Sequence, residues 1–150
     1  MQLTENISLK ELVFSKDAER LGIDNKPNEV EIQKLTTLAK NILQPVRTYF
    51  GKPIIISSGF RCKELNAAIG GEPNSQHVKA EAVDFVVKDV PLKDVFLFIS
   101  QNLNYDQLIY EFKRWIHCSY KTNGNRKQRL IASKINSTTV YSQYIGIHQL

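Results

Sequence analysis

Apolar residues recur at helical spacing through the first third of the chain. Three helices are predicted, over residues 9–13, over residues 16–21, and from Asn28 through Val46. Ser8 and Glu11 form a capping-box pattern that opens the first helix, and Gly22 is suited to end the second. Pro45 should kink or break the third near its end. This part of the chain is expected to supply packing rather than chemistry.

Runs of β-branched and aromatic residues predict strands in the remainder of the chain. The predicted strands cover residues 54–56, 82–87, 108–110 and 116–118, and the first of them is expected to be central in the sheet. Residues 130–132 fit a strand or a helical turn. A helical turn is expected near Leu65, and Pro91 opens a helix with an apolar face.

The length of 150 residues predicts one domain with enough core to fold without covalent staples. We assign residues 1–134 to this domain and residues 135–150, which are rich in Ser, Thr and Asn, to a loosely packed tail. No apolar run reaches the roughly 18 residues that a membrane helix needs. The first ten residues lack a signal-peptide pattern, so we expect synthesis in the cytoplasm without a signal and no integral membrane segment.

The net charge of +5 is unevenly spread along the chain. All 15 acidic residues lie at or before Glu111, whereas residues 112–150 contain seven basic residues and no acidic one. This asymmetry indicates an anionic partner, such as nucleic acid or an anionic cell envelope, or simply a solvated basic surface. No nucleic-acid-binding module accompanies the basic residues, so nucleic acid is not the expected partner.

Three side chains interrupt the apolar pattern in a way that packing does not explain. His77 ends a loop, Asp84 lies inside the apolar run 82–87, and His117 lies in the run 116–118. A carboxylate buried in a strand is costly unless a cation or several donors compensate it. Two imidazoles and a carboxylate form a ligand set for catalytic Zn²⁺ that leaves one position for water. Each residue alone fits an ordinary structural role, but together they predict a zinc site.

The other groups that bind zinc in proteins are less favoured here. Cys62 and Cys118 do not make a disulfide framework, and we expect reduced thiols, with zinc ligation a weaker alternative. His148 lies near the C-terminus in the segment expected to be loose, so it is not expected to bind the metal.

A catalytic zinc site also needs a proton acceptor, and Glu111 is the first candidate. A three-residue connection over 113–115 would place Glu111 opposite His117 on the same face of a hairpin. A two-residue connection would pair Glu111 with Ile116 and turn the carboxylate away. Glu81, which is close to the ligands in sequence, is the second candidate; a surface ion pair is the structural alternative for Glu111.

Residues that follow the strand over 54–56 are candidates for binding substrate. Arg61 leaves the end of this strand, where a guanidinium would hold a carboxylate or a developing oxyanion. A surface arginine at a helix start is the alternative. Ser75 and Gln76 precede His77 and would either line the cleft or shape the turn.

The ordered set of motifs resembles the zinc D-Ala-D-Ala carboxypeptidase family, in particular its short, phage- and bacteria-encoded branch related to endolysins. The matching motifs are Ser57-Ser58-Gly59-Phe60-Arg61, Leu65-Asn66-Ala67-Ala68-Ile69-Gly70-Gly71, Ser75-Gln76-His77 with Ala82 and Asp84, Gln107-Leu108-Ile109 with Glu111, and Trp115-Ile116-His117. The resemblance extends from about residue 8 to residue 132. Together the motifs are specific, although any one of them alone is weak.

The resemblance implies a role for each of these residues. His77, Asp84 and His117 would be the zinc ligands, Arg61 would contact substrate and stabilise the oxyanion, and Glu111 would act as general base and then acid. The implied fold is α+β, the small hedgehog/D-Ala-D-Ala-peptidase type, with helices packed on an antiparallel sheet. The implied reaction is hydrolysis of a peptide bond in peptidoglycan.

Two positions depart from the family's usual pattern. Ala80 stands where the family usually has a glycine three residues after the first histidine, and glycine there suits a positive φ or a close approach. Arg114 occupies the position, three residues before the second histidine, where other branches carry the catalytic acid. The nearest acidic residue is Glu111, which is the position used by the short branch.

The leading hypothesis is therefore a monomeric zinc peptidase that acts on the peptidoglycan stem peptide at the cell wall, as a phage- or virion-associated enzyme. The alternative is a non-catalytic wall-binding or virion structural module of the same fold. A nucleic-acid-binding protein is a third reading, which rests on charge alone. The orientation of Glu111, toward the zinc ligands or toward solvent, discriminates between the first two.

Overall fold

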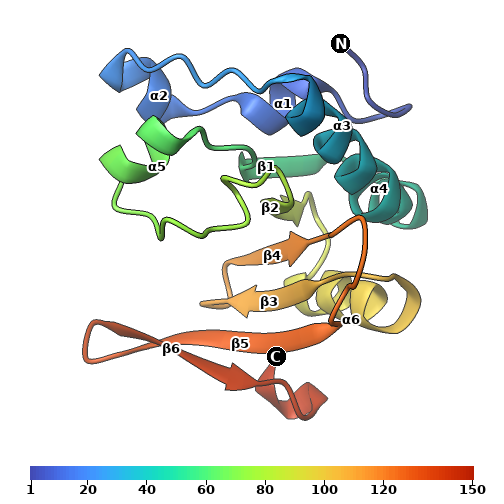
Figure 1. The fold of residues 1–150 in the computed structure, drawn as a ribbon. Coiled ribbons are helices and arrows are strands. Elements are labelled where there is room, and N and C mark those ends of the chain that lie inside the picture. Colours follow the sequence, from blue (N-terminus) through green and yellow to red (C-terminus); the bar gives the residue numbers. More distant parts are fainter.

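The computed structural model describes residues 1–150 as an α+β fold in which helices pack against one mixed sheet (Figure 1). The helices are α1 (Leu9–Val13), α2 (Lys16–Leu21), α3 (Glu29–Leu38), α4 (Gln44–Phe50), α5 (Lys63–Ala68) and α6 (Leu92–Asn102), with a π-helical turn at Ala39–Leu43 and a 3₁₀ turn at Ile147–Gln149. The strands are β1 (Ile54–Ser58), β2 (Ala82–Val87), β3 (Gln107–Glu111), β4 (Trp115–Ser119), β5 (Gln128–Ile135) and β6 (Thr138–Gln143). No helix combines the length and the apolar character needed to cross a bilayer.

The sheet has the strand order β1-β2-β4-β3-β5-β6. All neighbouring strands are antiparallel except β3 and β5, which are parallel. The α+β class and the mainly antiparallel sheet predicted from the sequence are therefore confirmed. β1 is an edge strand rather than the central one that its apolar run indicated, and Ile55 on it is 52% exposed.

α1 and α2 begin and end where the sequence predicts, and the third helix begins as predicted but continues through α4 to Phe50, past the predicted end at Val46. Ser8 and Glu11 form the capping box of α1, and Asn28 and Glu31 form that of α3. The helix does not break at Pro45. Instead, α3 passes through the π-helical turn into α4, where Pro45 lies in the first turn and needs no backbone donor.

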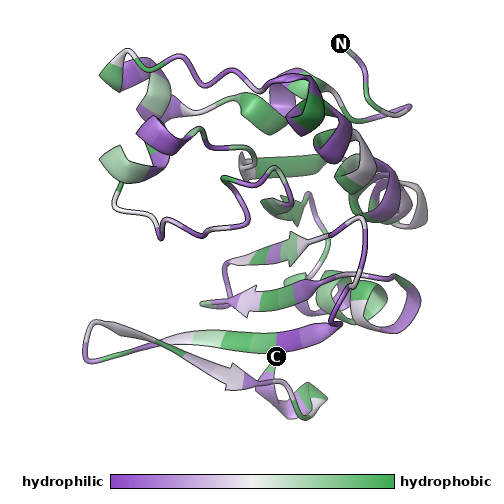
Figure 2. Ribbon diagram, viewed as in Figure 1, coloured by the Kyte–Doolittle hydropathy of each residue, from purple (hydrophilic) through white to green (hydrophobic).

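The hydrophobic core lies between the sheet and the helices, and one sheet face supplies much of it. Strand side chains on this face pack with Val95, Phe96 and Ile99 of α6. Figure 2 shows the resulting pattern, with hydrophobic strands at the centre and a hydrophilic connection from α5 to β2. Because side chains alternate along a strand, the residues between the core positions project from the opposite face, where the candidate site lies.

The C-terminal segment, which the sequence analysis leaves as a loose tail, contains strand β6. It pairs with β5 over six residue pairs, from Leu130–Gln143 to Ile135–Thr138, although most of its side chains are exposed. The predicted boundary at residue 134 falls inside β5. The backbone hydrogen bonds of this hairpin order the segment even though it buries few apolar side chains.

Candidate metal centre

His77, Asp84 and His117, which are far apart in sequence, come together on the open face of the sheet. The pairing of β2 with β4 places Asp84 directly opposite His117. The Nδ1 atom of His117 lies 2.8 Å from Oδ1 of Asp84, and the Nε2 atom of His77 lies 3.3 Å from Oδ2. One ligand atom from each of the three residues lies within 4.8 Å of the other two.

The loop before β2 holds His77 in a defined orientation. Its Nδ1–H donates to the carbonyl oxygen of Gly59 at 2.7 Å, which leaves the lone pair of Nε2 directed toward Asp84. The backbone N–H of His77 donates to Oγ of Ser75 at 3.2 Å. Ala80, at the position where glycine was expected, has a φ of +59° and a fully buried methyl group. The left-handed backbone that the glycine pattern indicated is thus retained with a small side chain.

The charges within this cluster support one another. Burial alone would raise the pKa of Asp84, but hydrogen bonds and charge interactions with His117 and His77 outweigh it and hold this pKa well below its ordinary value. Burial would lower the pKa of His117, but the hydrogen bond that His117 donates to Asp84 and the charges of Asp84 and Glu111 raise it. The carboxylate therefore stays ionised, as a metal ligand must.

The three side chains fit a zinc ion. Two imidazole nitrogens and a carboxylate are a known catalytic zinc donor set, and the Gly59 carbonyl supplies the second partner that zinc-binding histidines usually have. The distance of 3.3 Å between His77 and Asp84 is close to the edge of a tetrahedron around zinc, which is about 3.3 Å for ligands at roughly 2.0–2.1 Å. The 2.8 Å between His117 and Asp84 is a hydrogen-bond distance, which would lengthen when both bind a metal. The donor set thus suits a tetrahedral metal with one open position.

Glu111 lies at the end of β3 beside this ligand set, and its side chain is 13% exposed. The β3–β4 connection has three residues, but they are 112–114, so Glu111 pairs with Trp115 and lies diagonally across from His117. Its Oε1 atom is 4.0 Å from Nδ1 of His117. Burial raises the pKa of Glu111; Asp84 adds to this effect, whereas His117 and Arg61 oppose it. Because Trp115 and His117 are two residues apart on β4, Glu111 projects from the same face of the sheet as His117.

Arg61 approaches the same site from the segment between β1 and α5. Its Nε donates to Oγ of Ser58 at 3.3 Å and its Nη1 to Oδ1 of Asn66 at 2.9 Å, while Nη2 has no partner in the protein. A side chain at Gly71 would clash with the Asn66 amide and crowd this guanidinium, so the glycine is needed there. Burial lowers the pKa of Arg61, and the charges of Asp84 and Glu111 oppose that shift.

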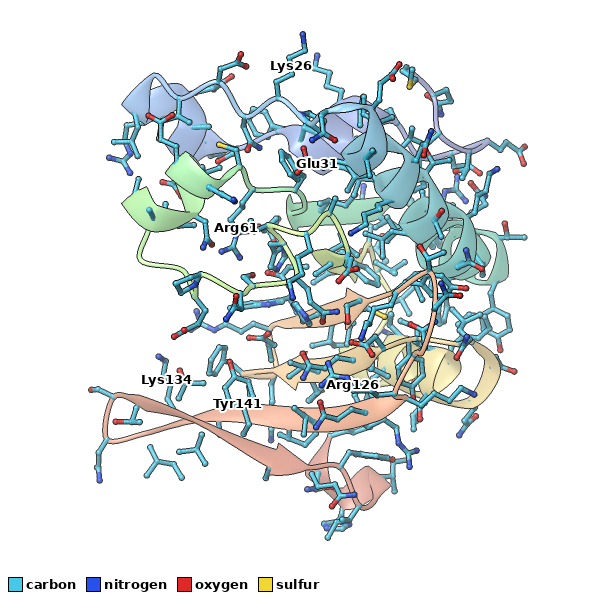
Figure 3. All side chains as sticks on the ribbon, viewed as in Figure 1. Lys26, Glu31, Arg61, Arg126, Lys134 and Tyr141 are labelled. Atoms are coloured by element: carbon cyan, nitrogen blue, oxygen red, sulfur yellow. The ribbon has the colours of Figure 1, made fainter.

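These residues line one open cleft of about 970 Å³. Ser75 and Gln76, predicted to bind substrate, also line it, and both have structural contacts: Ser75 with the His77 backbone, and Gln76 with Glu81 and Asp106. In Figure 3, Arg61 lies on the side of α5, and Tyr141 lies across from it on the side of β6. The sequence analysis did not single out Tyr141, because it assigned residues 135–150 to a loosely packed tail.

Asp106 and Arg126 also went undetected as part of the cleft. The fully buried Asp106 carboxylate accepts hydrogen bonds from Nη2 of Arg126 at 2.7 Å, from Nε of Arg126 at 3.0 Å and from Nε2 of Gln76 at 3.0 Å. The pair ties the segment after β4 to the residue that precedes His77. Asp106 and Arg126 are 20 positions apart, and no local pattern in the sequence indicates that they pair.

The Asp106 pair predicts a specific loss of stability in acid. Burial alone would raise the pKa of Asp106, but the hydrogen bonds from Arg126 and Gln76 lower it to about 2. Because the folded-state pKa is below the unfolded value of about 3.9, the stabilisation is complete above pH 4 and disappears as the pH falls toward 2. Urea unfolding at pH 7 should show Asp106→Asn to be less stable than wild type by about 3 kcal/mol.

Between pH 5 and pH 2 this difference should shrink by about 2 kcal/mol, since the wild type alone loses the ionised group. Asp17→Asn is the matched control, because Asp17 makes an exposed ion pair with Arg20. A gap between wild type and Asp106→Asn that stays constant over this pH range would contradict the assignment.

The remaining candidate ligands lie elsewhere. Both cysteines are free; Cys118 is buried, and burial raises the pKa of its thiol, while Cys62 precedes α5 and its sulfur accepts from the Leu65 N–H. His148 lies exposed in the C-terminal 3₁₀ turn. Glu81, the second candidate for the proton acceptor, does line the cleft, but its carboxylate contacts Lys34 and Gln76.

Comparison with known proteins agrees with this geometry. A search among curated proteins gave no significant match. The sequence profile of a family described as peptidase M15 matches residues 5–119, which include the His77–Asp84–His117 cluster, Arg61 and Glu111. Members of this family are zinc-dependent metallopeptidases, in keeping with the His77–Asp84–His117 cluster. With the matched region covering most of the sequence and containing the entire cluster, this chain belongs to the peptidase M15 family.

Proposed function

We propose that the protein is a zinc peptidase that hydrolyses a peptide bond in bacterial peptidoglycan, as a carboxypeptidase or an endopeptidase of the endolysin type. The observation that carries the proposal is the orientation of Glu111. Its largely buried carboxylate faces the ligand set instead of solvent, 4.0 Å from His117. A module that only binds the wall would not require a buried carboxylate beside three metal ligands.

His77, Asp84 and His117 would hold the metal, with Gly59 orienting the first imidazole. When bound, zinc polarises a substrate carbonyl and lowers the pKa of water enough for attack at neutral pH. The two cross-strand residues are fixed by the β2–β4 pairing, and His77 is fixed by its loop contacts. The site is therefore preorganised by backbone hydrogen bonds.

Glu111 would accept the proton of the attacking water and then deliver it to the leaving amine. Burial raises the pKa of Glu111 toward neutral pH, and a group that both accepts and donates a proton works best when its pKa is near the working pH. The opposing charges of His117 and Arg61 keep the ionised form available. We therefore assign Glu111, rather than Glu81, as general base and acid.

Arg61 would bind the substrate and stabilise the negative charge that develops on the carbonyl oxygen. Its contacts with Ser58 and Asn66 fix two of the guanidinium nitrogens and leave Nη2 free to donate. Ser75 and Gln76 would bound the cleft near the scissile bond. The cleft volume of about 970 Å³ is at the upper end of ligand sites and suits several residues of an extended peptide.

The proposal extends to the setting of the reaction. We infer a monomer that acts at the cell wall, encoded by a phage or prophage or associated with a virion. The basic residues after Glu111 support an anionic envelope as the surrounding surface.

Digestion of purified peptidoglycan tests the proposal directly. The zinc-loaded protein should release new amino or carboxyl termini from the wall, detected by mass spectrometry of the soluble fragments. A chelator should stop the release, and added Zn²⁺ should restore it. Tight zinc binding without any release of termini would instead identify the non-catalytic wall-binding module.

A further inference from the structure

A second cavity, of about 710 Å³, lies beside the catalytic cleft at the tip of the β3–β4 hairpin. The hairpin loop and β5 form its walls, and Trp115 lines both this cavity and the catalytic cleft. The two spaces are thus adjacent, separated by one aromatic side chain. Nothing in the proposed catalytic roles uses this second space.

The cavity is basic. Lys113 and Arg114 line it from the loop and Lys134 from β5, and its lining contains no acidic residue. None of the three forms an ion pair; Lys134 donates to Thr139 and lies 5.4 Å from the centre of the Phe112 ring. Three of the seven basic residues after Glu111 therefore gather around one apolar hollow with their charges uncompensated.

The loop that carries two of these cations has a fixed conformation. Phe112 and Lys113 have backbone φ values of +54° and +58°, which residues other than glycine rarely adopt. The Phe112 N–H donates to the Ala132 carbonyl at 2.9 Å, and the Arg114 N–H donates to the Glu111 carbonyl at 2.8 Å. Two successive residues with positive φ, closed by the hydrogen bond from Arg114 to Glu111, have the pattern of a type I′ turn, which β-hairpins favour and which holds Lys113 and Arg114 in place.

Trp115 adds an unpaired donor to the boundary between the two spaces. Its Nε1 is the one buried side-chain nitrogen or oxygen in the chain without a hydrogen-bond partner. Buried polar groups are almost always paired, so this unpaired donor marks the boundary between the two spaces as unusual.

We propose that this cavity is a subsite for a carboxylate of the peptide substrate, an inference that rests on the peptidase function proposed above. Trp115 precedes His117 by two residues along β4, or about 7 Å. An extended peptide with its scissile bond at the ligand set would therefore bring a carboxylate two or three residues away to Lys113, Arg114 and Lys134. The shared lining residue Trp115, which brings the cavity next to the catalytic cleft, favours the substrate itself over a separate wall polymer.

Two matched peptides test the subsite with the zinc-loaded protein. The first is a peptidoglycan stem pentapeptide with a free carboxylate on its second residue, D-isoglutamate, and the second carries D-isoglutamine there. Wild type should cleave the carboxylate form with a kcat/KM about tenfold higher, the size of one charge-assisted hydrogen bond. Arg114→Gln/Lys134→Gln should bring the ratio close to one, while Lys113 is kept to preserve the turn.

Lys26→Gln is the control, since Lys26 lies at the opposite end of the molecule from Lys134 (Figure 3). It should keep the wild-type ratio. An unchanged ratio in the double variant, with both peptides still cleaved, would overturn the subsite and leave the peptidase function intact. No cleavage of either peptide or of whole peptidoglycan by wild type would remove the proposed function, and the subsite with it.

A phosphate-bearing wall polymer is the competing occupant. Polyglycerol phosphate added to the wild-type assay should leave cleavage of the carboxylate peptide unaffected up to concentrations well above the substrate KM. Inhibition that disappears in Arg114→Gln/Lys134→Gln would reassign the cavity to phosphate and overturn the carboxylate proposal.

Discussion

His77→Ala should lose bound zinc and peptidase activity together. Changing only the outer partners of a metal ligand typically weakens metal binding by about 10–100-fold, so removing the ligand itself should weaken it by at least about 100-fold. Zinc content after dialysis, measured by atomic emission, and release of peptidoglycan termini provide the two readouts. Loss of the imidazole also leaves the Gly59 carbonyl without its 2.7 Å partner.

His148→Ala is the matched control, because it removes an exposed histidine outside the cluster. It should retain both zinc and activity. Circular dichroism on each variant establishes that the fold persists, and Asp84→Asn offers a second, nearly isosteric ligand change if His77→Ala unfolds. Full zinc occupancy in both ligand variants would contradict the assigned metal centre.

Glu111→Gln should keep the metal and lose turnover. The amide has the size of the carboxylate but cannot accept a proton, so we expect kcat to fall by about 10²–10⁴-fold. Zinc content should match that of the wild type, because Glu111 lies outside the ligand cluster. In the wild type, kcat/KM should decline as the pH falls through the pKa of Glu111, since protonation removes the base.

Glu81→Gln separates the two candidate bases. Its carboxylate is already engaged by Lys34 at 3.5 Å and by Gln76 at 3.3 Å, so this change should affect kcat far less than Glu111→Gln. If Glu111→Gln digests peptidoglycan at the wild-type rate and Glu81→Gln does not, the base assignment is reversed.

Local patterns in the sequence predict the elements of the fold well, because they depend on neighbouring residues. The capping box at Ser8, the helix start at Asn28 and the end of α2 at Gly22 are examples. The place of β1 in the sheet and the existence of β6 depend on which strands pair, and their apolar patterns do not encode this. β6 buries little surface and is held mainly by backbone hydrogen bonds to β5, so hydrophobic patterning alone does not reveal it.

The candidate site also divides into features that local patterns predict and features that depend on how distant segments pair. Asp84 and His117 were identified because each is a polar residue in an apolar strand, and the β2–β4 register brings them together. The position of Glu111 depends on the register of the β3–β4 hairpin. The sequence left two registers open, pairing Glu111 with His117 or with Ile116, and the structure shows a third, in which Glu111 pairs with Trp115. Asp106 and Arg126 meet across the chain, with no local pattern to indicate their contact.

Gly59 lies between the candidate metal centre and the N-terminal helix α1 and contacts both. Its carbonyl receives the His77 imidazole, the next N–H, that of Phe60, donates to the Leu12 carbonyl of α1 at 2.7 Å, and any Cβ at Gly59 would collide with that carbonyl. Zinc held by His77 would therefore also stabilise the segment on which α1 docks, because a ligand that binds only the folded state favours that state. We expect added zinc to raise the unfolding temperature of the protein as well as to support catalysis.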